Sequence, residues 1–169
     1  MNRILCQWAL SLSLALVLSN AVAATSSSGS PGRGGRGGID ELHLLTVPVA
    51  LNLDREPGLD GFEVRVYGSS ADKAKGLAIT RGALEILMFD GVVKESGIGS
   101  ATPLKIWIYA PSELKPFATT STLGLGYRMA LRWGTNTPSY ASITVVARHL
   151  VPKMDPIYSS SSVVAVSTK

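Results

Sequence analysis

The sequence predicts an all-β domain: an antiparallel β-sandwich of six to seven strands, immunoglobulin-like or prealbumin-like in topology and without a disulfide. Short runs of alternating apolar and polar residues recur along residues 42–166, which is typical of strands with one buried face. Clusters of Gly, Pro, Asp, Asn and Ser separate these runs, and a helical period is nearly absent. The only cysteine is Cys6, so the framework has no covalent cross-link and must depend on a hydrophobic core.

Residues 1–23 have the features of a secretory signal peptide. Arg3 supplies a positive start and an apolar stretch follows. Ala21 and Ala23 fit the small-residue rule for cleavage after Ala23, with cleavage after Ala24 as the alternative. An uncleaved anchor is the alternative, but the apolar stretch is shorter than the roughly 18–20 residues that a span needs. We therefore expect an exported protein, periplasmic or extracellular, with no membrane span after cleavage.

Residues 24–39 are expected to form a flexible Gly/Ser/Arg tether, and residues 40–169 the β-sandwich domain. The tether has almost no apolar side chain to bury, so ordering it would gain nothing to offset the entropy lost. Its two Arg-Gly-Gly units are typical of spacers as well as of RNA-binding segments. Three of the 16 basic residues precede residue 40, which leaves 13 against 12 acids. A basic face for nucleic acid is not predicted.

The first predicted strand covers residues 42–53, with Leu45, Val47 and Val49 on its buried face. Pro48 cannot donate a hydrogen bond to a neighbouring strand, so we expect this strand to lie at a sheet edge or to bend. Further strands are predicted at residues 62–67, 83–89 and 104–110, each with alternating apolar positions.

The connections between these strands are predicted to be irregular, at residues 68–76, 92–102 and 117–122. A one-turn helix is expected at residues 111–115, with Ser112 as its N-terminal cap.

The clearest alternation lies in residues 123–133 and 141–148, and a last strand is expected at residues 158–166. The turn residues between the first two runs favour an antiparallel pair. Trp133 ends the first alternation and is predicted to be a core residue.

Three stretches, residues 54–62, 103–114 and 123–133, resemble a group of uncharacterised exported proteins from free-living bacteria. The shared features are an acidic turn, a strand followed by a helical turn, and a Gly-containing segment that enters a strand ending near Trp. This resemblance implies a β-sandwich of unknown function and no catalytic residue.

An acidic turn is the best candidate for a metal site. Asp54, Glu56 and Asp60 lie within seven residues and offer oxygen ligands for Ca²⁺. Their spacing is not that of an EF-hand, Arg55 adds a positive charge, and Pro57 and Gly58 already account for a turn. We favour a solvated structural turn over a calcium site.

Other chemistries have weaker candidates. His43 and His149 are the only histidines, and we expect both to face solvent on strands. Gly124 and Gly126 lack the following helix of a phosphate loop. Five aromatic residues are candidates for a sugar-stacking platform but are more typical of strand packing: Trp107, Tyr109, Tyr127, Trp133 and Tyr140.

Taken together, these patterns favour a non-catalytic binding or structural module of the cell envelope or extracellular space. Its partner would be a protein or polysaccharide of the envelope, and no cofactor is predicted. A carbohydrate-binding module is one alternative, which requires two or more of the five aromatics exposed together. An unrecognised hydrolase is the other, which requires a histidine in a cleft beside a carboxylate and a Ser or Thr.

Overall fold

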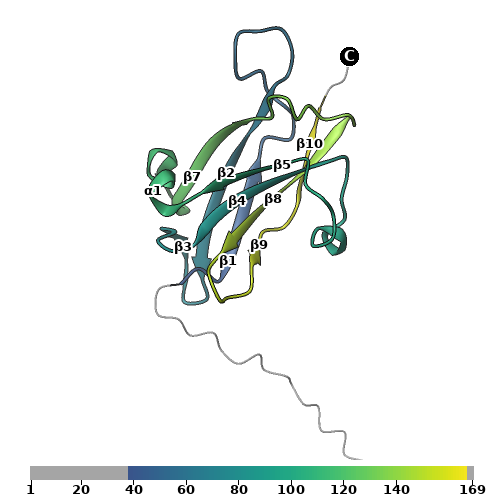
Figure 1. The fold of residues 1–169 in the computed structure, drawn as a ribbon. Helices are drawn as coiled ribbons and strands as arrows, with labels where there is room; N and C mark the ends of the chain where they lie inside the picture. The colour runs from purple at the N-terminus through teal and green to yellow at the C-terminus, as the bar shows by residue number, and fades with distance from the viewer. Residues whose placement is uncertain (1–37, 167–169) are drawn as a thin grey trace, which may run out of the picture. The chain divides into compact units, whose positions relative to one another are not determined.

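A computed structural model describes residues 38–166, and these residues form two sheets packed face to face, antiparallel except for one short parallel pairing in the first sheet (Figure 1). The first sheet contains β1 (Glu41–Thr46), β2 (Gly61–Ser70), β3 (Lys73–Leu77), β6 (Ala118–Ser121) and β7 (Gly124–Arg132). The second contains β4 (Ala83–Asp90), β5 (Lys105–Tyr109), β8 (Ser142–Leu150), β9 (Ile157–Tyr158) and β10 (Ser162–Ala165). The predicted all-β sandwich is confirmed. It has more strands than expected because the short strands β3, β6 and β9 have no alternation long enough to recognise.

The main core lies between the two sheets. β2 pairs with β7 in a register that sets Phe62 beside Leu131, Val64 beside Met129 and Val66 beside Tyr127. The second sheet contributes the alternate residues of β4 and β8, as the sequence predicted. The inward apolar side chains of those two strands are all fully buried, and they are Leu84, Ile86, Met88, Ile143, Val145 and Ala147.

A second, smaller hydrophobic cluster lies on the outer face of the second sheet. Leu87 and Phe89 of β4 and Val146 of β8 are buried there beneath Ile98. Ile98 comes from the connection between β4 and β5, which contains the short 3₁₀ helix η1 (Glu95–Gly97). Because this connection covers the outer face, β4 and β8 are buried on both faces, which explains their nearly continuous apolar sequences.

β7 and β8 are not a pair, contrary to the prediction. β7 pairs with β2 and β6 in the first sheet, whereas β8 pairs with β4 and β10 in the second. The residues between β7 and β8 carry the chain from one sheet to the other instead of closing a hairpin. The alternation correctly identified the buried face of each strand but contained no information about its partner.

The first strand is shorter than predicted and presents the opposite face. β1 ends at Thr46, before Pro48, and lies at a sheet edge as expected. Leu45 and Val49 are each 49% exposed, while Leu42 is buried. Leu42 lies opposite Gly68 in the pairing with β2, and Leu44 opposite Val66, so the even-numbered residues share the inward face of β2.

Three smaller predictions also differ from the structure. Residues predicted as a polar connection form the β2–β3 hairpin. The stretch predicted as irregular, residues 117–122, begins at the last residue of η2 (Lys115–Phe117) and contains the edge strand β6. The helical turn α1 (Pro111–Leu114) is present, but Ala110 and not Ser112 is its N-terminal cap. The Glu113 carboxylate accepts the Ala110 N–H at 2.7 Å, which is the part of a capping box that the third helical residue supplies.

The start of the described region belongs to the core. Ile39, which the sequence placed at the end of the tether, is only 7% exposed and packs with the main cluster. The predicted signal peptide and the rest of the predicted tether, up to residue 37, lie outside the described residues.

We predict that Trp133→Ala lowers the free energy of unfolding by roughly 3–5 kcal/mol, the range for emptying a buried aromatic site. Trp133 is 3% exposed and belongs to the main core, as predicted. Tyr140→Ala is the matched control, since Tyr140 is 63% exposed. Chemical denaturation of both variants checks this, and equal loss of stability in the two would contradict it.

Candidate functional site

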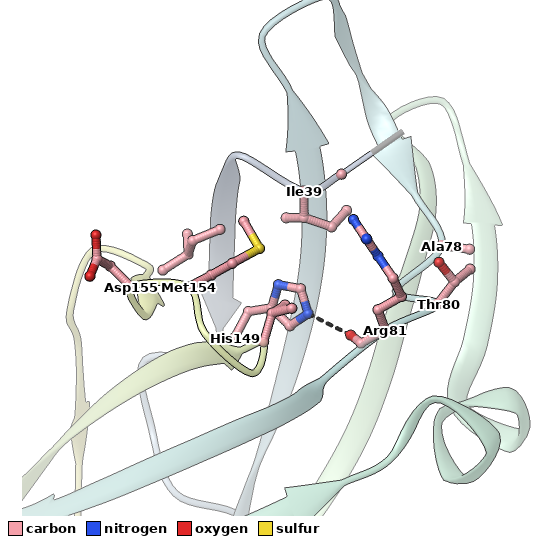
Figure 2. Close-up of a pocket in the computed structure, with 10 residues that line it drawn as sticks. Ile39, Ala78, Thr80, Arg81, His149, Met154 and Asp155 are labelled. Carbon is pink, nitrogen blue, oxygen red and sulfur yellow. Dashed lines mark hydrogen bonds between the residues drawn. The ribbon is translucent and has the colours of Figure 1, made fainter. Parts of the chain in front are cut away.

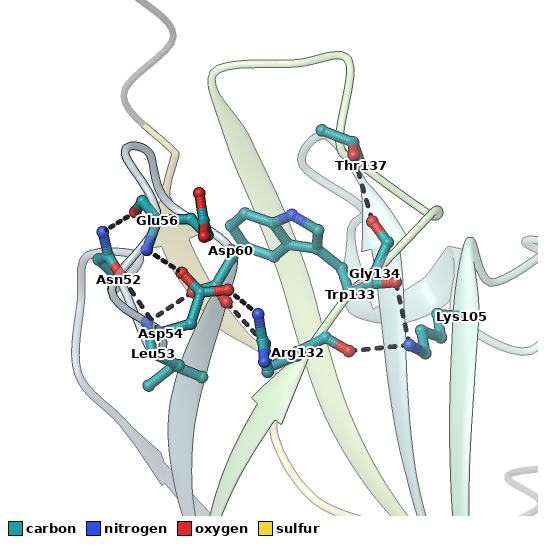
Figure 3. A network of polar contacts seen from close by, with 10 residues as sticks. All are labelled: Asn52, Leu53, Asp54, Glu56, Asp60, Lys105, Arg132, Trp133, Gly134 and Thr137. Atoms are coloured by element: carbon teal, nitrogen blue, oxygen red, sulfur yellow. Dashed lines mark hydrogen bonds and ion pairs between the residues drawn. The ribbon is translucent and has the colours of Figure 1, made fainter.

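The acidic turn lies between Leu51 and Gly61, which form an isolated antiparallel bridge at its base, and it leads into β2. Hydrogen bonds from its own side chains fix the conformation of the turn (Figure 3). The Asp54 carboxylate accepts the Glu56 N–H at 2.8 Å, and the Asn52 side-chain oxygen accepts the Asp54 N–H at 3.2 Å. The Asn52 amide in turn donates to the Glu56 carbonyl at 2.6 Å. These are Asx-type turn bonds, the ordinary reason for Asn and Asp to occur in tight loops.

Arg132 of β7 lies between two of the three predicted ligands. Its guanidinium pairs with Asp54 Oδ2, and its Nε lies 2.7 Å from Asp60 Oδ2. The other oxygen of Asp60 accepts the Leu53 N–H at 2.6 Å. Arg132 reaches the turn because its backbone lies opposite Gly61, the residue after Asp60, in the β2–β7 register.

Each carboxylate oxygen of Asp54 and Asp60 therefore has a partner from the protein itself. Glu56, the third predicted ligand, is exposed. Within residues 38–166, no three His, Cys, Asp or Glu side chains gather in a group suited to a metal ion. A calcium ion at this turn would have to displace the Arg132 guanidinium, and calcium binding by Asp54, Glu56 and Asp60 stays a prediction that we do not favour.

The two histidines differ in their surroundings. His43 has a half-exposed side chain, and its Nε2 lies 2.9 Å from the Ser69 hydroxyl on the outside of the first sheet. His149 is only 4% exposed, so the expectation that both histidines face solvent is wrong for His149. Its position at the end of β8 is covered by residues from other segments, including Ile39 and Ile157. The sequence around His149 does not predict this covering.

His149 lines a small cavity whose volume of about 20 Å³ has room for a single water molecule (Figure 2). Its Nε2 lies 2.8 Å from the Arg81 carbonyl oxygen and must carry the proton, because a carbonyl can only accept. In the neutral ring Nδ1 is then an acceptor, and within the described residues it has no hydrogen-bond partner. Thr80 and Asp155 line the same cavity.

The five aromatic candidates do not form an exposed platform. Trp133 and Tyr127 are buried, and Trp107 and Tyr109 are half-buried. The Trp107 ring meets Phe62 edge to face, with centroids 5.6 Å apart, at the open side of the sandwich. Tyr140 alone of the five is exposed.

Gly124 and Gly126 have structural roles. Gly124 adopts a φ of +95°, which turns the chain into β7. A Cβ at Gly126 would lie 2.4 Å from the Tyr67 ring, which covers this strand. Gly124 thus serves a turn and Gly126 a close contact within the sheet, and β7, a strand, follows where a phosphate loop would have a helix.

The edge strand β5 carries an apolar surface that the sequence analysis did not single out. Ile106 is 41% and Ile108 61% exposed, and both point away from the main core. The alternate side chains, Trp107 and Tyr109, point inward but remain partly accessible because no further strand follows β5 in its sheet. We refer to Ile106 and Ile108, together with the unpaired backbone edge of β5, as the β5 patch.

No helix among residues 38–166 is long and apolar enough to cross a membrane.

Comparison with known proteins establishes no family for this chain. No protein-family model and no curated protein sequence matches it. Among solved structures it is similar to chitinase ChiW from Paenibacillus sp. str. FPU-7, a cell-surface-expressed multi-modular enzyme, with 11% identity and a TM-score of 0.34. The match covers 83% of this chain but only 10% of the chitinase chain. So low a score supports no conclusion on fold or function, and the resemblance to uncharacterised exported proteins stays a prediction.

We predict that Arg132→Gln destabilises the domain by roughly 1–2 kcal/mol, between the values for an exposed ion pair and for hydrogen bonds to charged groups. Arg55→Gln, in the same turn but exposed and without a described ion pair, should change stability little.

Thermal melts of the unchanged protein in excess chelator and in millimolar Ca²⁺ should superimpose, since the carboxylates already have partners. A Ca²⁺-dependent rise in melting temperature that disappears in Asp60→Asn would establish the calcium site instead.

Proposed function

We propose that the protein is an exported, non-catalytic binding or structural module of the cell envelope or extracellular space, and that the β5 patch is its contact surface. The observation that supports this proposal is the exposure of Ile106 and Ile108 at alternating positions of an edge strand. An edge strand presents backbone donors and acceptors to any chain that can pair with it. The exposed isoleucines beside that edge offer apolar surface, and burying this surface on association would favour binding.

Protein is the class of partner that this surface fits best. A pairing strand would satisfy the backbone of β5 and cover the isoleucines at the same time, which a sugar chain does not do. Sugar recognition depends instead on exposed aromatic faces. Of the five aromatics considered for that role only Tyr140 is exposed, so the carbohydrate-binding alternative lacks the paired platform that it requires.

The surroundings of His149 favour a second candidate function, a hydrolase. A histidine held by one ring nitrogen, with the other nitrogen free to accept a proton, is the arrangement of a general base. Here the Arg81 carbonyl accepts from Nε2, Nδ1 has no hydrogen-bond partner among residues 38–166, and Thr80 and Asp155 line the same cavity. The cavity is too small for a substrate other than water, so we place this function behind the binding module.

We predict that Ile108→Lys abolishes the capture of envelope components by the immobilised protein. A lysine at this exposed position removes apolar contact and adds a charge to any strand pairing at β5. Val163→Lys is the matched control. Val163 is a 47% exposed β-branched residue on β10, the opposite edge strand of the same sheet. Quantitative comparison of captured proteins checks this, and an identical captured set with both variants would refute the β5 patch as the contact surface.

For the hydrolase candidate, we expect no esterase activity above that of His149→Gln when both proteins are given activated esters such as p-nitrophenyl acetate. The glutamine can still donate to the Arg81 carbonyl but cannot act as a general base. Steady-state hydrolysis rates are the measurement. A rate that is at least about tenfold higher in the unchanged protein would favour the hydrolase over the binding module.

A further inference from the structure

We propose that the partner of the β5 patch is a second copy of this chain, and that two copies pair through antiparallel β5 strands about a two-fold axis at Trp107. This inference rests on the proposed binding function and specifies its partner. It joins the two second sheets into one continuous sheet across the dimer.

β5 is the open edge of the second sheet. At the opposite edge, β10 is covered by the segment after β1: the Ala165 N–H donates to the Pro48 carbonyl at 2.9 Å, and the Ala50 N–H donates to the Ala165 carbonyl at 2.8 Å. No strand of the described region covers β5 in this way (Figure 1). The backbone of β5 on that side therefore remains available to another chain.

The edges of the first sheet are less suitable for pairing. β1 is followed by Pro48, packs against β8, β9 and β10, and carries Glu41 and His43 on its exposed face. β6 has only four residues, all exposed and three of them hydroxylated. Neither edge combines a free backbone with a pair of exposed apolar β-branched side chains, as β5 does with Ile106 and Ile108.

β5 also lacks the features that usually protect an edge from pairing. Proteins guard exposed edges with proline, bulges or lysines that extend into solvent. β5 contains no proline, and its one charged residue is Lys105. The Lys105 ammonium donates to the carbonyls of Arg132 and Trp133 at 2.8 and 2.9 Å and lies 4.9 Å from the Trp107 ring centroid. The charge is thus bound within the same molecule and does not guard the edge (Figure 3).

The sequence of β5 is complementary to itself in one antiparallel register. With the axis at Trp107, Ile106 of one copy lies opposite Ile108 of the other, and all four isoleucines meet on the outer face. Cross-strand pairs of β-branched residues stabilise sheets, and a two-fold interface uses the same patch on both copies. Pro111 begins α1 two residues after β5 ends, so the pairing is limited to the five residues centred on Trp107.

The predicted interface is small. Five paired residues and four isoleucines bury less than the roughly 1,200 Å² of total surface that is usual for stable complexes. We therefore expect a dimer that dissociates on dilution, with a Kd on the order of micromolar or weaker.

Sedimentation equilibrium of the purified protein over a wide concentration range tests the dimer. We expect a monomer–dimer equilibrium that Ile108→Lys weakens by more than about tenfold, because two copies of the variant lose the isoleucine contacts and bring lysines to the same face. Val163→Lys should leave the equilibrium unchanged. A dimer that persists in Ile108→Lys would place the interface elsewhere and refute the proposal.

Cysteine cross-linking tests the register in a Cys6→Ser background, which has no other cysteine. Directly opposed residues in an antiparallel pair have Cα atoms about 4.5–5.5 Å apart, within reach of a disulfide, whereas diagonal neighbours at about 7–8 Å are not. A mixture of Ile106→Cys and Ile108→Cys proteins should form a heterodimeric disulfide under mild oxidation, and each variant alone should form little. Equal cross-linking in all three samples would overturn the predicted register.

The two experiments separate this inference from the proposed function. A protein that stays monomeric at every concentration, but whose capture of an envelope protein is lost in Ile108→Lys, would refute the second copy and keep the binding module. A monomer whose captured proteins are unaffected by Ile108→Lys would refute both.

Discussion

The pairing of β2 with β7 is the interaction on which the rest of the structure depends. Its inward residues form the floor of the main core, in the order Phe62–Leu131, Val64–Met129 and Val66–Tyr127. Tyr127 also accepts the Ile79 N–H at 2.8 Å through its hydroxyl, which fixes the segment entering β4. A slip of one residue in this register would turn every one of these side chains outward, so the two strands are held in place by the whole core.

The outer face of the same pair has a like-charge contact that the structure compensates. Arg65 lies directly opposite Arg128, an arrangement that destabilises a sheet when left alone. Glu63 lies between them, 2.6 Å from the Arg128 guanidinium and 3.6 Å from Arg65 Nε. The hydrogen bond from Arg128 holds the pKa of Glu63 below its ordinary value despite partial burial. This carboxylate therefore stays charged to lower pH than an ordinary glutamate, and it can pair with both arginines over that wider range.

The sequence was sufficient to predict the fold class and the buried faces of β2, β4, β7 and β8, because alternation reports which side chains avoid water. It was not sufficient to predict which strands pair. β7 and β8 follow each other with turn residues between them, but the chain changes sheet there, and that choice depends on contacts with β2 and β4 far along the sequence. In β1, apolar residues occupy both alternating positions, so only the pairing with β2 decides that Leu42 and not Leu45 is buried.

The dependence on residues far apart in the sequence also explains which features of the candidate sites the sequence predicted and which it did not. Asp54 and Asp60 were recognisable as turn residues from local sequence, since their backbone bonds are local. Arg132, which neutralises both, is more than 70 positions away in sequence and meets them only through the β2–β7 register. The burial of His149 likewise results from segments that converge on the end of β8. Local chemistry was predictable, and the long-range partners were not.

The two edges of the second sheet differ in how far the rest of the chain covers them, and this difference explains why the β5 patch is exposed. On one side the chain places residues 48–50 against β10 and packs β1 over the neighbouring strands, which satisfies backbone groups and covers apolar surface. Over the outer face of β4 it lays the connection that buries Leu87 and Phe89. On the other side Trp107 fills the opening between the sheets, and Lys105 satisfies the last carbonyls of the β7 end. Those two residues seal the interior but contribute nothing to the outside of β5. Ile106 and Ile108 are thus left exposed after the core of the described residues is complete, and the association that we propose would remove this apolar surface from water.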